Sequence, residues 1–144
     1  MLDLWSYPVS FYFDVQILGI SLRFHEVSGL NQQIELVHIP EGGGVGYEVP
    51  KELKHGNLVL KRAINPIIRD IFDNWVSCTF EDEKNVTTMD LMISLLDSDG
   101  NKQCMWYISD AYPVKWDVGN FSAKNGELVM ETTELAFYRI TRYL

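Results

Sequence analysis

The side chains best suited to nucleophilic or metal chemistry are three histidines and two cysteines, and their spacing favours neither kind of site. His25, His38 and His55 lack the close spacing of metal ligands, and the chain has no C-x-x-C motif. Nothing in the sequence singles out Cys78 and a histidine as nucleophile and base. The carboxylates show no spacing that marks a catalytic pair. We therefore expect no catalytic residue, no metal site, no cofactor and no enzymatic activity.

Two loops resemble ligand-binding motifs. Residues 42–46 read Gly-Gly-Gly-Val-Gly, which matches neither G-x-G-x-x-G nor the P-loop, and no helical pattern follows to offer its N-terminus to a phosphate. Residues 97–101 read Asp-Ser-Asp-Gly-Asn, like the start of a calcium loop, but Ile108 stands at the twelfth position, where a glutamate is needed. We interpret residues 40–50 as a long, projecting docking loop between two strands, and residues 97–101 as a hairpin turn.

Length and composition indicate a single domain, residues 1–144. The hydrophobic content of 47% excludes intrinsic disorder, and a chain of this length buries roughly 70% of its unfolded surface. The formal net charge of −8 argues against a nucleic-acid coat, which needs a basic face. No apolar stretch approaches the ~18–20 residues that span a bilayer, and no basic segment begins the chain. We expect synthesis and folding in the cytosol, no stable membrane insertion of the monomer, and two reduced, mostly buried cysteines.

The charge is unevenly distributed along the chain. Between residues 51 and 69 five basic side chains stand against one acid, so this stretch carries +4 and the remainder carries −12. The five are Lys51, Lys54, Lys61, Arg62 and Arg69. A basic region on an acidic body suits head-to-tail contact between copies of the chain. Scattered, solvated charge is the alternative.

Hydrophobic periodicity predicts mostly strands and one helix. Alternation of apolar and polar residues predicts strands at residues 11–17, 22–27, 33–39, 58–62, 89–95, 104–108 and 127–139. The helix is expected at residues 66–76, with Asn65 as its cap, Pro66 at its first position and an apolar stripe toward the core. The fold class is therefore mainly β, a small antiparallel barrel or sandwich with one flanking helix.

The last predicted strand does not suit a self-sufficient monomer. Val129, Leu135 and Phe137 make one face apolar, and Leu128, Met130 and Ala136 make the other face apolar as well. A strand with two apolar faces is either fully buried or covered by a partner chain. We therefore expect Val129, Leu135 and Phe137 to belong to an inter-subunit strand.

Six blocks, in order, resemble the inner-tube proteins of contractile phage tails and contractile injection systems. They are residues 7–13 (Tyr-Pro-Val-Ser-Phe-Tyr-Phe), 26–30 (Glu-Val-Ser-Gly-Leu), 41–44 (Glu-Gly-Gly-Gly), 56–62 (Gly-Asn-Leu-Val-Leu-Lys-Arg), 112–116 (Tyr-Pro-Val-Lys-Trp) and 131–136 (Glu-Thr-Thr-Glu-Leu-Ala). The motif residues are Val27, Ser28, Gly29, Leu30, Asn57, Lys61, Arg62, Pro113, Lys115, Trp116, Glu131 and Glu134. The blocks span nearly the whole chain, so their combination is more specific than any one of them.

The resemblance implies a β-barrel that assembles into hexameric rings, and these rings stack into a hollow tube inside a sheath protein. It also implies baseplate hub or spike proteins as partners, effector or DNA cargo in the lumen, and membership of a phage-tail-like particle. A projecting arm would contact the next subunit or ring through Glu41, Gly42, Gly43, Gly44, Gly46 and Tyr47. The helix would offer its outer face, with Arg69 and Asp73, to neighbours or sheath.

The C-terminal sequence departs from the family pattern. The family often ends in His-Glu-Gly, whereas residues 137–144 read Phe-Tyr-Arg-Ile-Thr-Arg-Tyr-Leu. This ending, together with residues 111–113 (Ala-Tyr-Pro), is more similar to the paralogue that initiates the tube at the baseplate than to the trunk subunit. Two alternatives stay open: a secreted effector-carrying ring like the haemolysin-coregulated proteins, and a small-molecule-binding barrel, which needs a closed apolar pocket in one monomer.

Overall fold

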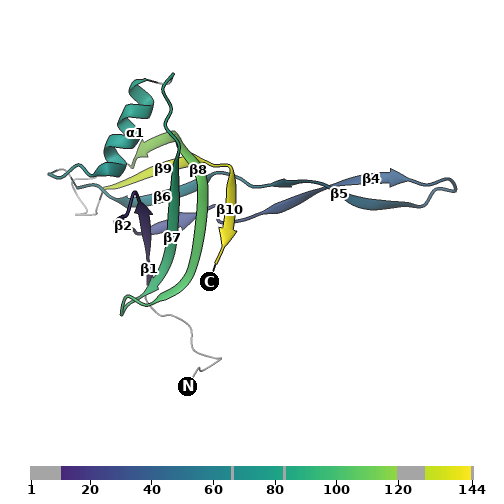
Figure 1. Ribbon diagram of the computed structural model, residues 1–144, viewed down its shortest axis with the longest axis horizontal. Helices are drawn as coiled ribbons and strands as arrows, with labels where there is room; N and C mark the ends of the chain where they lie inside the picture. The colour runs from purple at the N-terminus through teal and green to yellow at the C-terminus, as the bar shows by residue number, and fades with distance from the viewer. Residues whose placement is uncertain (1–10, 66, 83, 120–128, 144) are drawn as a thin grey trace.

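The computed structural model describes residues 11–65, 67–82, 84–119 and 129–143, and these residues form ten strands and one helix (Figure 1). Predictions for residues 7–10, Pro66, 127 and Leu128 lie outside the described residues. The elements are β1 Phe11–Ile17, β2 Ile20–Phe24, β3 Glu26–Ser28, β4 Gln33–Pro40, β5 Gly46–Lys54, β6 Leu58–Ala63, α1 Ile71–Glu81, β7 Met89–Asp97, β8 Lys102–Val118, β9 Met130–Ala136 and β10 Arg139–Arg142. The expected fold class, mainly β with antiparallel pairing and one helix, is confirmed.

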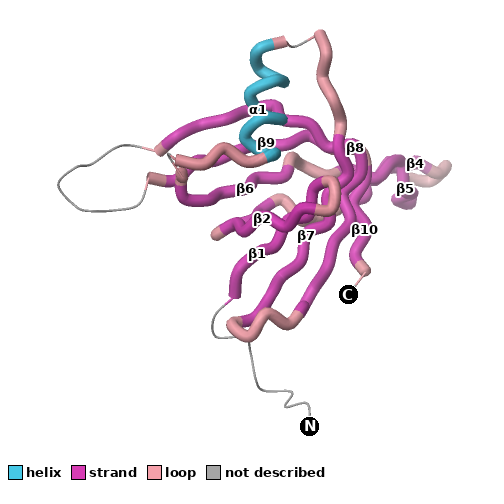
Figure 2. Tube along the Cα trace, turned by 60° about the vertical axis from the view of Figure 1, so that its left-hand side comes forward, coloured by secondary structure: helices cyan, strands magenta, loops and turns pink. Residues whose placement is uncertain are grey.

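The main sheet curls into a barrel. Its strands follow the order β2-β1-β7-β8-β9-β6-β3, and each neighbouring pair is antiparallel. Only His25 separates β2 from β3, so the two ends of this path are consecutive in the chain. The His25 backbone N–H donates to the Lys61 carbonyl at 2.9 Å, which ties the junction to β6. The sheet therefore closes on itself, and Figure 2 shows the curl.

Strand β8 is long enough to serve both walls of the barrel. Its first half pairs with β7 and β10, and its second half pairs with β9. Asp110 lies between the two halves with φ of 52°, and a register shift follows at Pro113/Lys115. Bulges and left-handed residues bend a strand sharply. The predicted strand 104–108 is thus only part of a strand of 17 residues.

The core is built from the inward positions of the predicted strands. It contains Val15, Ile17, Phe24, Leu58, Leu60, Phe72, Trp75, Val76, Leu91, Ile93, Ile108, Ala111, Leu135, Phe137 and Ile140. The assignment of Leu135 and Phe137 to an inter-subunit strand is wrong, because Leu135 is 0% exposed and Phe137 is buried within the same chain. Val129 is half-buried, and its place at an interface stays a prediction.

The helix begins later than the sequence suggested. It spans Ile71–Glu81 instead of 66–76, because Asp70 is the N-cap and forms a capping box with Asp73. Asn65 makes a local turn in which its side-chain oxygen accepts from the backbone N–H groups of Ile67 and Ile68. Ile67 is 89% exposed, so the apolar stripe starts only with the helix itself.

The glycine-rich segment is the tip of a projecting hairpin. Strands β4 and β5 pair with each other from Gln33/Lys54 to Pro40/Gly46, and residues 41–45 join them. The hairpin forms a separate two-stranded sheet that extends away from the barrel (Figure 1). The expected long loop at residues 40–50 is therefore mostly strand, and β5 was missed because Pro50 and four charged residues interrupt its alternation. We call residues 33–54 the arm.

The turn at residues 97–101 agrees with its prediction, whereas the burial of the two cysteines does not. The turn at residues 97–101 is a hairpin turn in which Asp97 Oδ1 accepts from the backbone N–H groups of Asp99 and Asn101. The cysteines are not mostly buried: Cys78 is exposed and Cys104 is half-buried. Within the described part of the chain, no helix is long and apolar enough to cross a membrane.

The burial of Leu135 yields a direct stability prediction. Replacing Leu135 with Ala should lower the free energy of unfolding by roughly 2–5 kcal/mol, because it removes transfer energy and leaves a cavity. Ile67→Ala is the matched control, since it trims an exposed aliphatic side chain and should change stability by less than about 0.5 kcal/mol. Urea denaturation of both variants measures the difference. Equal stability of the two variants would contradict the core assignment.

Candidate assembly surfaces

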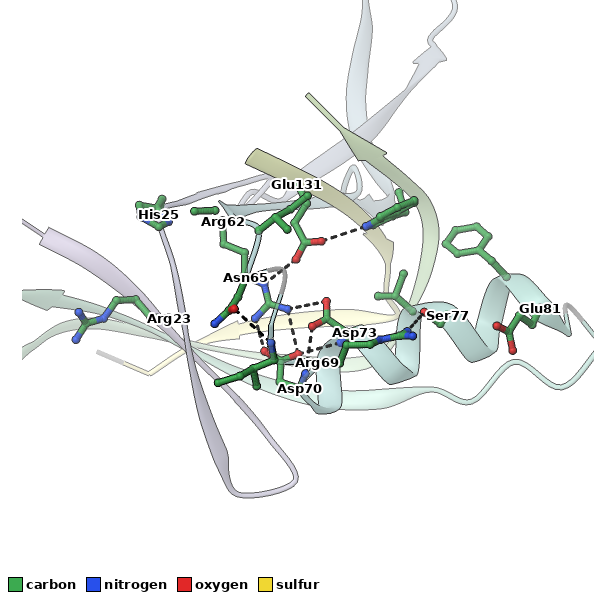
Figure 3. Close-up of a pocket in the computed structure, with 16 residues that line it drawn as sticks. Arg23, His25, Arg62, Asn65, Arg69, Asp70, Asp73, Ser77, Glu81 and Glu131 are labelled. Carbon is green, nitrogen blue, oxygen red and sulfur yellow. Dashed lines mark hydrogen bonds and ion pairs between the residues drawn. The ribbon is translucent and has the colours of Figure 1, made fainter. Parts of the chain in front are cut away.

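A buried arginine connects the helix to the barrel. Arg62, on β6, is 9% exposed and faces three carboxylates (Figure 3). Its Nη1 and Nη2 donate to both oxygens of Asp70 at 2.5 and 3.0 Å. Nη2 also donates to Asp73 Oδ1 at 3.1 Å, and Nε donates to Glu131 Oε1 at 2.9 Å. We call these four residues the Arg62 cluster.

Two aromatic rings flank the same guanidinium. Its carbon lies 4.9 Å from the centroid of the Phe24 ring and 5.1 Å from that of Phe72. The two rings meet edge to face at 5.2 Å. A guanidinium near aromatic faces gains cation–π attraction while it buries its apolar stem. The Arg62 cluster is therefore continuous with the hydrophobic core.

Burial and pairing shift the pKa values within the cluster in different directions. Desolvation alone would lower the pKa of Arg62, but hydrogen bonds to Asp70 and Glu131 outweigh it and raise that pKa. Desolvation would raise the pKa of Asp70, but the hydrogen bonds from Arg62 and the Asp73 backbone prevail and lower it. At Asp73 desolvation prevails, and the pKa is raised.

An open groove lies beside this cluster, between α1 and the barrel. It has a volume of about 740 Å³ and takes residues from β2, β6, β8, β9 and the helix. Its wall includes three large apolar side chains that are well exposed, namely Ile68 (63%), Phe80 and Trp116 (51%). Trp116 Nε1 donates to Glu131 Oε2 at 3.4 Å, which orients the indole beside the cluster. We call this the helix groove.

The arm carries apolar side chains on both of its faces. Residues directly opposite in the hairpin share a face, and successive residues alternate. Ile39 therefore shares a face with Tyr47, and Ile34 shares the other with Leu53. All four are exposed. Within the described residues, no arm side chain belongs to the hydrophobic core, so the barrel leaves the apolar surface of the arm uncovered.

His55 anchors the root of the arm. Its ring stacks on Phe137 with centroids 3.9 Å apart and an interplanar angle of 4°. Its two nitrogens lie 2.9 Å from the Gly56 carbonyl oxygen and 3.0 Å from that of Tyr138. Just before the other strand of the arm, β4, the side-chain Nε2 of Gln32 donates to the Ile140 carbonyl oxygen at 2.5 Å. These contacts fix the direction in which the arm leaves the barrel.

Several motif residues meet in space for architectural reasons. Gly29 has φ of +89°, and a Cβ there would lie 2.1 Å from the Asn57 carbonyl oxygen, so only glycine fits. Asn57 Nδ2 donates to Glu134 Oε1 at 2.9 Å. Val27 and Leu30 pack against the core, and Ser28 pairs with Val59. Pro113 is buried and Lys115 is exposed. The Nζ atom of Lys61 lies 4.0 Å from Oε2 of Glu26.

The Arg62 cluster changes the prediction that Asp73 lies on the outer face of the helix. Asp73 does not point outward, because its carboxylate serves Arg62 and the capping box. Arg69 precedes the helix, and its Nη2 donates to Ser77 Oγ at 2.5 Å along the helix groove. Sequence reasoning missed Asp70 as a partner of Arg62. The D-x-x-D spacing of the capping box was the available signal for this helix start.

Removing the Arg62 guanidinium should strongly destabilise the chain. Arg62→Met leaves three clustered carboxylates without their cation, so the free energy of unfolding should fall by about 3–5 kcal/mol at neutral pH. Because the pKa of Asp70 is lowered by folding, its pairing stabilises the wild type above its unfolded pKa and is lost as pH falls through the folded value. The difference in the free energy of unfolding between wild type and Arg62→Met should therefore become smaller as the pH is lowered.

Denaturation of wild type and variant from about pH 7 down to about pH 2 measures this difference in the free energy of unfolding, because the lowered pKa of Asp70 lies below its ordinary value. Arg69→Met is the control, because it removes an exposed guanidinium from the same groove and should cost about 0–1 kcal/mol. A deficit below 1 kcal/mol for Arg62→Met would count against the cluster as the joint between helix and barrel.

Comparison with known proteins gives a consistent family. The family described as T4-like virus tail tube protein gp19 matches residues 9–141. No curated protein sequence matches the chain. A chain of the PVC extracellular contractile injection system, in the sheath-tube complex in its extended state, has a TM-score of 0.83 at 22% identity and covers 97% of this chain and 93% of that one.

Two further structures share the fold. A chain of the anti-feeding prophage baseplate has a TM-score of 0.78 at 21% identity, with coverage of 99% of this chain and 97% of that one. Hcp1 from Flavobacterium johnsoniae is more distant, with a TM-score of 0.58 at 15% identity and coverage of 91% and 94%. Because the family match spans nearly the whole chain, the protein belongs to the T4-like virus tail tube protein gp19 family.

Proposed function

We propose that the chain is a structural, non-catalytic subunit of the inner tube of a contractile tail or injection system. In this proposal it assembles into hexameric rings that stack around a lumen inside a sheath. The observation that carries the proposal is the arm, which exposes apolar side chains on both faces and contributes none to the described core. An isolated two-stranded hairpin is marginally stable in water, so the arm needs a partner surface.

The family match and the fold support the same function. The sheath-tube and baseplate chains that share the fold come from contractile injection systems, and their TM-scores of 0.83 and 0.78 exceed the 0.58 of Hcp1. We therefore favour a contractile-tail subunit over a secreted effector-carrying ring. The helix groove is open and lined by charged groups, unlike the closed apolar pocket that a small-molecule-binding barrel would need.

Within the tube we propose the initiator position, next to the baseplate hub and spike proteins. The support is the C-terminal sequence, which departs from the trunk-subunit ending. Its residues form β10, which pairs with β8 and extends the wall of the barrel. One ring of six would then template the trunk, and effector or DNA cargo would pass through it. The particle would assemble in the bacterial cytoplasm before its release or attachment.

Negative-stain electron microscopy of the purified chain at rising concentration tests the proposed function. We expect rings with a central hole, because the arms can then be covered by neighbouring copies. Single or double rings would support the initiator position, whereas long hollow tubes would assign the chain to the trunk. Monomers alone at every concentration, with and without baseplate partners, would contradict the tube function.

A further inference from the structure

The root of the arm is tied to the barrel by two side chains, one before β4 and one after β5 (Figure 1). Gln32 Nε2 donates to the Ile140 carbonyl oxygen at 2.5 Å, and Nε2 of His55 lies 3.0 Å from the Tyr138 carbonyl oxygen. Both strands of the arm are therefore anchored to residues 138–140, where β10 begins. Of these two anchors, only the imidazole belongs to a side-chain type that changes its charge between about pH 5 and pH 8.

Both ring nitrogens of His55 face groups that can only accept a hydrogen bond. Nδ1 lies 2.9 Å from the Gly56 carbonyl oxygen, and Nε2 lies 3.0 Å from that of Tyr138. A neutral imidazole carries one N–H, so it donates to one of these oxygens and turns a lone pair toward the other. The doubly protonated ring donates to both, through the stronger hydrogen bonds that a charged donor makes. The geometry therefore fits the charged ring better than either neutral tautomer.

The stacking of this ring on Phe137 favours the same protonation state. The two ring centroids lie 3.9 Å apart with an interplanar angle of 4°. Phe137 is buried and belongs to the hydrophobic core. A cation over an aromatic face is attracted by the negative charge of that face, and a neutral ring lacks this attraction. His55 thus joins the root of the arm to the core most strongly when it is charged.

No ion pair holds the His55 ring in the part of the chain that the structure describes. The charged side chains on the segments around it contact other groups: Lys54 pairs with two arm glutamates, one carboxylate accepts from Asn57, and two arginines contact a tyrosine ring and a cysteine sulfur. Protonation is therefore coupled to the two carbonyl groups and the Phe137 ring. The titratable and charged side chains on these segments are Lys54, Glu35, Glu52, Glu134, Tyr138, Arg139 and Arg142.

We propose that His55 is a pH-sensitive latch, which fixes the direction of the arm when its imidazole is protonated. The charged ring holds both carbonyl oxygens and stacks on Phe137. The neutral ring gives up one of the two hydrogen bonds, and the arm then swings through a wider range of directions about its root. The latch closes as the pH falls and opens as the pH rises. It is a property of the single chain, so it goes beyond the proposed tube function and does not depend on it.

Distances between the arm tip and the barrel, measured by pulsed electron paramagnetic resonance, test the latch. Cys78→Ala and Cys104→Ala remove the native thiols, while Val45→Cys in the arm tip and Ser98→Cys in the turn between β7 and β8 carry the spin labels. The labelled chain is kept at a concentration where sedimentation velocity shows a monomer, so that no second copy holds the arm. We expect a distance distribution about twice as wide at about pH 8 as at about pH 5.5, since the latch opens across this range.

Histidine variants of the labelled chain identify the group that responds. His55→Gln should give the same width at both pH values, because its amide can donate to the Tyr138 carbonyl oxygen but does not titrate. His38→Gln is the matched control on the arm itself, where that ring lies 3.2 Å from a carboxylate oxygen of Glu48, and it should keep the response. An equal width for the wild-type sequence at both pH values would overturn the proposal. A response that survives in His55→Gln, or that disappears in His38→Gln, would overturn it as well.

Nuclear magnetic resonance of the histidine rings provides an independent check. Long-range correlation of ring protons with ring nitrogens distinguishes the doubly protonated ring from each neutral tautomer, and the signal missing from His55→Gln assigns the His55 ring. We expect this ring to gain its second proton over the same pH range in which the distance distribution narrows. A narrow distribution with a neutral His55 ring would contradict the latch.

Discussion

The Arg62 cluster is the interaction on which the arrangement of helix and barrel depends. A guanidinium that is 9% exposed needs its charge balanced locally, and here Asp70 and Asp73 from the helix start and Glu131 from β9 provide that balance. The same two aspartates form the capping box, so one pair of side chains both starts α1 and ties it to β6.

The chain separates the residues that build the barrel core from an arm that lies outside it. The barrel closes through the junction of β2 and β3 and buries a continuous core, whereas the arm contributes nothing to that core. Its apolar side chains remain exposed although a soluble monomer gains nothing from exposing them. In the stacked assembly that we propose, neighbouring copies would cover these residues. Membership of the tail tube family is consistent with such a surface.

Sequence periodicity was sufficient for most strands, because alternation reports burial on one face and the barrel core uses that face. Periodicity failed where an element forms for a reason other than the burial of one face. Strand β5 is held by pairing with β4 rather than by packing, and its charged residues conceal it. The helix start is marked by the local D-x-x-D spacing of Asp70 and Asp73, but Asn65 and Pro66 offered an earlier start of the usual type; the pairing of Asp70 with Arg62 is what no local pattern reveals. Leu135 is one of the alternating buried positions of β9, but its neighbours on the other face are apolar too, and this pattern suggested an interface.

The central claim, that the arm serves assembly and not folding, is tested most directly by removing the arm. Gln33 and Lys54 pair across the two strands, so a short glycine-serine turn can replace residues 33–54 between Gln32 and His55. Thermal unfolding and sedimentation velocity would compare this chain with the intact one. The account predicts an unchanged unfolding midpoint and a monomer at concentrations where the intact chain forms rings. Rings formed without the arm, or a chain that no longer folds, would contradict it.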